Sequence, residues 1–252
     1  MVQQIFSRTS RAIELVTLFL AAPMALAFFV PVRLVIPSIL LFGVVCLFVL
    51  LRDPTFNRRE LWNTVVLKAR LPGMILRVSL AAAVMLLALR LIAPDRLFAL
   101  PLERTGLWTI IMLGYPLASA YPQELAFRTF FRHRYRPLFH GDISYLAVNA
   151  TLFGLAHLVM RNPLAVIASA LGGLVLAWSF ERGRSTAAVW IEHAAYGCLI
   201  FTIGWGPWFY AGTIRGTDRP GGQSESATVG SDGSSGSVKA RSANEASQCL
   251  PM

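Results

Sequence analysis

The stretch Tyr121–Arg136 reads YPQELAFRTFFRHRYR and places charged side chains at the end of a strongly apolar segment. Its centre is Gln123-Glu124, followed four residues later by Arg128. On a helix, Glu124 and Arg128 share a face and can form an ion pair. Such a pair is costly at the edge of a membrane. It therefore indicates either a functional site or a salt bridge that lets a helix end sit in the interface.

The composition of the whole chain is that of a membrane protein. Of its 252 residues, 55% are hydrophobic and 14% are charged, and the mean hydropathy is +0.57. Soluble domains carry roughly 25% charged residues. The net charge of +10 is spread between apolar runs and not gathered on one polar domain, so we expect no nucleic-acid partner. The three cysteines form no disulfide or metal motif.

Several segments approach the length of about 20 apolar residues that a membrane-spanning helix needs. We therefore predict an all-α, polytopic membrane helix bundle of about seven spans. Basic residues precede the first segment and follow the second, fourth and sixth, which predicts a cytoplasmic N-terminus. The segments are Ala12–Val30, Leu34–Leu51, Met74–Ile92, Leu107–Phe127, Ser144–Met160, Leu164–Phe180 and Thr186–Trp205.

The predicted organisation has three parts. Residues 1–106 hold the N-terminal spans and a basic cytoplasmic loop, and residues 107–210 hold the core spans with the polar motifs. Residues 211–252 are rich in Gly and Ser and poor in large apolar residues. Such a segment cannot bury enough surface to offset its ordering entropy, so we predict a disordered tail.

Two histidines lie in later apolar segments, His157 at the end of FGLAH and His193 within WIEHAAYG. Ionisable groups inside a membrane are expected to face the bundle interior and to meet one another. A carboxylate and two imidazoles can activate a water by general base catalysis and steady an oxyanion. Equally, they can bind a divalent metal such as zinc. Each histidine alone is also consistent with a hydrogen bond between helices.

These motifs resemble the CPBP family of intramembrane proteases, which includes the CAAX prenyl endoproteases and the bacterial Abi-type proteins. The resemblance covers residues 107–205. Glu124 matches the second glutamate of the family motif Glu-Glu-x-x-x-Arg, and Arg128 matches its arginine. Phe153 and His157 match the motif Phe-x-x-x-His, and His193 matches the histidine of the third motif.

The resemblance implies a glutamate and a histidine that activate a water, and a later His and Asn that support the oxyanion. Two positions depart from it. The first glutamate, credited with the general-base role, is Gln123, and the Asn of the third motif is Gly197. Either Glu124 takes the role of the base or catalysis is impaired. Glu192 adjoins His193, but helical neighbours point about 100° apart, so we expect it to orient elsewhere.

The three polar positions lie at different depths of the predicted spans. Glu124 lies near the cytoplasmic end, His193 deeper and His157 deeper still. Their convergence requires the fourth helix to continue past Phe127 with a tilt or re-entrance. The following residues, up to Arg136, are consistent with an interfacial amphipathic helix.

We interpret the chain as an intramembrane endopeptidase that cleaves a membrane-associated peptide or protein, in the bilayer of a bacterial cytoplasmic membrane. Glu124 is expected to be the base or water-orienting carboxylate, with His157 as its partner and Arg128 holding it in place. His193 is expected to stabilise the oxyanion. Gln123 and Phe153 are supporting residues. No cofactor is certain, and a zinc-like metal held by Glu124, His157 and His193 stays open.

Two other functional classes remain. A non-catalytic scaffold or chaperone of the same family is favoured by Gln123 and Gly197. A small transporter that uses Glu and His as a relay is a third possibility. Against it, the sequence has no internal repeat or pair of broken helices of the sort that carriers often show.

Overall fold

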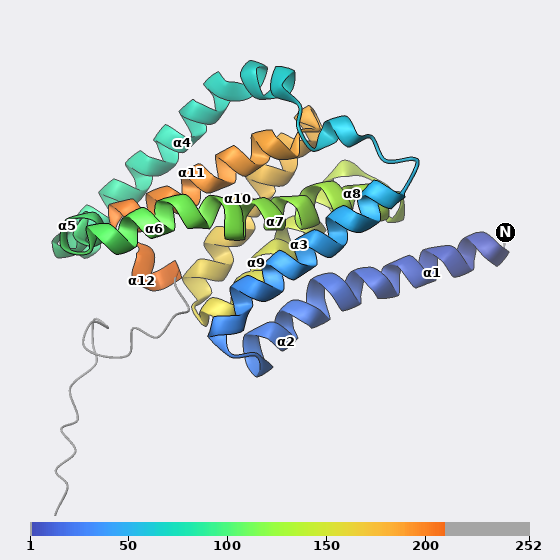
Figure 1. Cartoon of the computed structure of the whole chain (residues 1–252), viewed down its shortest axis with the longest axis horizontal. Coiled ribbons are helices and arrows are strands. Elements are labelled where there is room, and N and C mark those ends of the chain that lie inside the picture. Colours follow the sequence, from blue (N-terminus) through green and yellow to red (C-terminus); the bar gives the residue numbers. More distant parts are fainter. Residues whose placement is uncertain (1, 210–252) are drawn as a thin grey trace, which may run out of the picture. The chain divides into compact units, whose positions relative to one another are not determined.

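The computed structural model describes residues 2–209, and every regular element in that range is a helix, with no strand in it (Figure 1). The predicted tail, 211–252, lies outside the described residues. The α-helices are α1 Val2–Val16, α2 Ala22–Phe29, α3 Val35–Arg52, α4 Thr64–Ile92, α5 Ala99–Glu103, α6 Thr105–Tyr115, α7 Tyr121–Glu124, α8 Phe131–Tyr135, α9 Asp142–Ala156, α10 Pro163–Gly183, α11 Thr186–Ile203 and α12 Gly206–Phe209.

Six helical stretches within residues 2–209 are long and apolar enough to cross a membrane, and they confirm six of the predicted segments. The fourth predicted segment is helical too, but it is not among these six. The chain is therefore an integral membrane protein with an all-helical fold. The six stretches are Arg8–Phe29, Val32–Arg52, Arg58–Ile92, Asp142–Met160, Pro163–Gly183 and Thr186–Ile203.

The fourth segment is one continuous helix that includes α6, α7 and α8. Two π-helical turns, Pro116–Ala120 and Leu125–Phe130, join the three α-helices without leaving the right-handed helical region. Pro116 and Pro122 lack the N–H that would bond to the preceding turn, and π turns are rare features that occur mostly as single turns inside α-helices, frequently at functional sites. The continuation past Phe127, required for the polar residues to converge, is therefore present.

The apolar side of the end of this helix is buried inside the protein. Phe130, Phe131 and Tyr135 are all buried, and they pack around Phe19 from the first span. The rings of Phe19 and Phe131 meet edge to face with their centroids 5.0 Å apart. Edge-to-face packing of this kind is favourable for aromatic rings. It fixes the α6–α8 helix against the first span.

Figure 1 shows the α6–α8 helix running between α11 and α3, and both neighbours contact it. On the other side of the bundle α10 packs along α9. This contact is close because Gly154 faces α10: a Cβ added to it would lie 2.8 Å from the carbonyl oxygen of Val166. Gly173 of α10 likewise makes room for the ring of Phe153. Glycine at these two positions brings α9 and α10 together.

Side-chain caps set the starts of α10 and α11. Asn162 accepts a hydrogen bond from the Leu164 amide at 2.9 Å, and Pro163 follows at the first helical position. Ser185 accepts one from the Ala188 amide at 3.3 Å. Both arrangements satisfy backbone donors that a helix start leaves free. The cap at Ser185 fixes where α11 begins, and therefore where His193 lies along it.

Candidate active site

Glu124 lies at the centre of the polar constellation and is fully buried. Its Oε2 accepts a hydrogen bond from Nε of Arg128 at 3.1 Å, which is the ion pair predicted from their spacing. Its Oε1 lies 2.8 Å from Nδ1 of His193. The structure therefore brings three of the four predicted catalytic residues into direct contact.

Arg128 is also fully buried, and a buried guanidinium is costly unless it is paired. Besides Glu124, it donates from Nη1 to Oδ1 of Asn149. Asn149 in turn donates to the carbonyl of Phe127 at 2.7 Å. The guanidinium lies over the ring of Phe153, 4.6 Å from its centroid, in a cation–π contact. Arg128 therefore links α9 to the helix that carries Glu124.

The hydrogen bonds of His193 define its tautomer. A carboxylate oxygen can only accept, so Nδ1 of His193 carries the proton donated to Glu124. Nε2 lies 3.0 Å from the hydroxyl of Tyr115, which can donate to it. Both ring nitrogens of His193 are thus engaged by protein groups, and the ring is held in one orientation.

His157 stands just past the end of α9, at the start of a 3₁₀ turn, His157–Met160. Its Nδ1 lies 2.8 Å from the carbonyl of Phe153, an acceptor, so Nδ1 carries the proton. Nε2 is then an unprotonated acceptor, and no residue within 2–209 hydrogen bonds to it. The ring of Phe153 contacts the rings of His157 and His193, with centroids 4.9 and 5.6 Å away.

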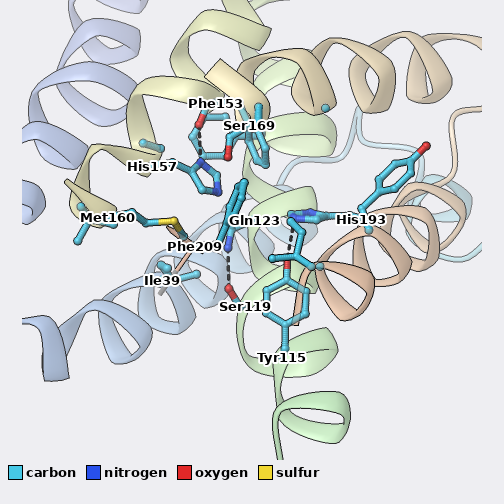
Figure 2. Close-up of a pocket in the computed structure, with 18 of the residues that line it drawn as sticks. Ile39, Tyr115, Ser119, Gln123, Phe153, His157, Met160, Ser169, His193 and Phe209 are labelled. Atoms are coloured by element: carbon cyan, nitrogen blue, oxygen red, sulfur yellow. Dashed lines mark hydrogen bonds between the residues drawn. The ribbon is translucent and has the colours of Figure 1, made fainter. Parts of the chain in front are cut away.

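A cavity of about 1410 Å³ opens beside these residues, and most of its lining is apolar. Its polar lining includes Tyr115, Gln123, His157 and His193, which Figure 2 shows pointing into the same space. Gln123 lies between the two histidines in this view and donates to Oγ of Ser119 at 2.7 Å. The site thus places a few polar side chains on the wall of a mostly apolar cavity, which is called the chamber below.

The two neighbours Gln123 and Glu124 face different ways. Gln123 lines the cavity, whereas Glu124 is fully buried and is not among the described residues that line it. Adjacent helical residues point about 100° apart, so only one of the pair can face the chamber. The residue that faces the chamber is Gln123, whose side chain is an amide and not a carboxylate.

The three side chains predicted to bind a metal are not arranged as metal ligands. Within residues 2–209, no group of three His, Cys, Asp or Glu side chains is placed to hold a metal ion. Both nitrogens of His193 are engaged by Glu124 and Tyr115, so a metal could bind His193 only by displacing one of them. Glu124, His157 and His193 are therefore not a preformed ligand set.

Glu192 orients away from Glu124, as the helical geometry predicted. It is fully buried and forms a bidentate ion pair with Arg77 of α4, at 2.7 and 3.0 Å. Ser179 and Tyr196 also donate to it, at 3.0 and 3.1 Å. This second polar cluster ties α4, α10 and α11 together and leaves Glu192 with four hydrogen bonds.

Sequence reasoning did not single out Tyr115 or Asn149. Asn149 begins a run, Asn-Ala-Thr, of the form of a glycosylation acceptor, which is irrelevant inside a span. A better signal was available, since a buried Asn within an apolar segment must find a hydrogen-bond partner. Tyr115 lies in an apolar run, and its only signal was indirect: the missing side chain at Gly197.

A family comparison covers the segment that holds this site. Residues 104–199 match the family described as Type II CAAX prenyl endopeptidase Rce1-like. Over this segment the chain is similar to the Rce1-like CAAX proteases. The matched segment runs from the residue before α6 into α11 and includes Glu124, Arg128, His157 and His193. No curated protein and no solved structure matches the chain. At the level of the family, the matched segment is that of an intramembrane endopeptidase.

Proposed function

We propose that the protein hydrolyses a peptide bond of a membrane-associated substrate, with His157 activating the water and the Glu124–His193 pair shaping the site. The observation that carries this proposal is the orientation of His157. Its Nδ1–H is anchored on the Phe153 carbonyl, and its unprotonated Nε2 belongs to a side chain that lines the cavity. That is what a general base needs.

The roles divide as follows. Nε2 of His157 takes a proton from a water as its oxygen attacks the peptide carbonyl carbon. The same nitrogen then gives that proton to the departing amine. Gln123 cannot act as the base, but one N–H of its amide is free beyond the bond to Ser119 and can donate to the carbonyl oxygen. Glu124 acts through His193, whose tautomer and orientation it fixes.

The chamber also indicates the class of substrate. Its lining is mostly apolar, so a peptide segment that already resides in or at the bilayer can enter with little desolvation cost. CAAX processing is one reaction of this class. We further propose, from the distribution of basic residues, that the N-terminus is cytoplasmic. From the resemblance to a family that includes the bacterial Abi-type proteins, we propose that the membrane is a bacterial cytoplasmic membrane.

The test compares wild-type protein, purified in detergent, with His157→Ala and Glu124→Gln against a library of apolar peptides. General base catalysis contributes about 10²–10⁴-fold, so His157→Ala should lose at least about 100-fold in kcat. Each reaction is repeated after exhaustive chelation. Because the donors are not arranged as a ligand set, cleavage should survive chelation, and loss of cleavage would restore a metal-dependent mechanism.

Two results would overturn the proposal. Cleavage by His157→Ala at the wild-type rate would remove this residue from the chemistry. No cleavage by folded wild-type protein, reconstituted in lipid with the same library, would point to a non-catalytic member of the family.

A further inference from the structure

Gly197 lies one helical turn after His193, on the same face of α11. A Cβ added there would overlap Cε1, Cζ and the hydroxyl oxygen of Tyr115. The phenol end of Tyr115 therefore fills the volume in which a side chain at position 197 would begin. In the CPBP family that the sequence resembles, this position of the third motif carries an Asn.

Tyr115 is well placed to supply a polar group there. It is the last residue of α6 and lines the cavity together with His193 and Gly197. Its hydroxyl lies 3.0 Å from Nε2 of His193, and the two rings meet edge to face. The missing side chain on α11 is thus matched by a hydroxyl that comes from a different helix.

Resting on the proposed function, we propose that Tyr115 replaces the absent side chain of position 197 and donates a hydrogen bond to the oxyanion of the reacting carbonyl. No polar side chain can extend from Gly197, whereas the Tyr115 hydroxyl lies on the wall of the chamber beside His193. Tyr115 and Gln123 would then form the oxyanion-binding pair of this protein.

The hydrogen-bond inventory allows this role. In the resting site, Tyr115 donates to Nε2 of His193, because Nδ1 holds the proton. Rotation about the Cζ–O bond redirects the hydroxyl proton to an oxyanion that forms in the cavity. A hydrogen bond to a charged acceptor is roughly twice as strong as a neutral one, so the exchange favours the transition state.

The first test is Tyr115→Phe, which removes one oxygen atom. Loss of a single oxyanion donor costs about 10²–10³-fold in kcat, so we expect a fall of at least about 100-fold with KM changed by less than about threefold. Tyr196→Phe is the matched control. It removes a hydroxyl from the same cavity, but one that bonds to Glu192, and its kcat should stay within about threefold of wild type.

The second test moves the polar group back to α11. Gly197→Asn alone should be inactive, because its side chain would overlap Tyr115. The double variant Tyr115→Ala/Gly197→Asn makes room for the amide, and we expect it to be at least about tenfold more active than Tyr115→Ala. A merely structural role of Tyr115 would not produce this rescue.

The outcomes separate the two proposals. If wild type cleaves and Tyr115→Phe cleaves equally well, the inference about Tyr115 is wrong and the proposed function stands. A double variant no more active than Tyr115→Ala would also overturn it, even if Tyr115→Phe fails to fold. Absence of cleavage by folded wild-type protein would overturn both.

Discussion

At the scale of single residues, the decisive feature is a buried carboxylate, Glu124, whose two oxygens are both hydrogen bonded to protein side chains. One oxygen accepts a hydrogen bond from Arg128, and the other accepts one from His193. Glu124 is fully buried and is not among the described residues that line the cavity, so it does not contact a water there. Its contribution is therefore to set the charge and tautomer of its neighbours, and a change at Glu124 acts through them.

Replacing Glu124 by Gln should reduce both activity and stability. Removing one partner of a buried ion pair costs about 3–5 kcal/mol, because Arg128 is left buried without a counter-charge. We expect a fall in the unfolding temperature in detergent, and a fall in kcat per folded molecule of at least about 100-fold. Both are measured on the same preparation.

The control is Glu124→Gln/Arg128→Met, which removes both charges and keeps a thioether on the ring of Phe153. This variant should regain stability but not activity. Recovery of activity in the double variant would show that the Glu124 charge is not needed for turnover.

At the scale of elements, the site depends on how closely α9 approaches α10. His157 follows directly after α9, so any displacement of that helix moves its imidazole. The approach is set by glycine, since the position of a Cβ at Gly154 lies within 2.7 Å of Cβ of Ala170. Packing in lipid relies on such small residues, because no hydrophobic effect drives helices together there.

Gly154→Ala should therefore separate the two helices. Overpacking of this kind costs about 1–3 kcal/mol, and the shift of His157 should lower kcat as well. Gly172→Ala on α10 is the control, because a Cβ there meets nothing within 4 Å. Thermal unfolding in detergent should show Gly154→Ala destabilised and Gly172→Ala equal to wild type or more stable. Equal unfolding temperatures for the two variants would contradict this account.

At the scale of the whole molecule, residues from several apolar helices line the chamber together with the polar side chains of the site. Gly114 of α6 lines it, and a Cβ there meets nothing within 4 Å. Gly114→Trp should therefore fill part of the chamber without disturbing the packing.

We expect Gly114→Trp to raise KM at least about tenfold for large apolar peptides while unfolding at the wild-type temperature. Gly106→Trp is the matched control: the position lies on the same helix and has no atom within 4 Å of its Cβ, but it is not among the described lining residues. It should leave KM unchanged. An unchanged KM for Gly114→Trp would show that substrate reaches the site by another route.

The sequence predicted most of this fold because its apolar runs have the length of a bilayer. It predicted the contact of Glu124 with Arg128 because four residues make one helical turn. It did not predict which of Gln123 and Glu124 faces the chamber, since two π-helical turns change the register of the helix around them. Tyr115 and Asn149 reach the site only through tertiary contacts, which local patterns do not encode.

The π-helical turns also determine how this site can change in evolution. A π turn holds one more residue than an α turn, so loss of one residue within Leu125–Phe130 would let that turn revert to a regular α-helix. Because the π turn accommodates its extra residue within a single turn, the residues beyond the deletion would keep nearly the same facing relative to those before it, and the side chains inside the turn would change direction. Substitutions change this site one contact at a time, whereas a three-nucleotide deletion in this part of the gene would redirect several side chains of the turn, Arg128 among them, in a single event.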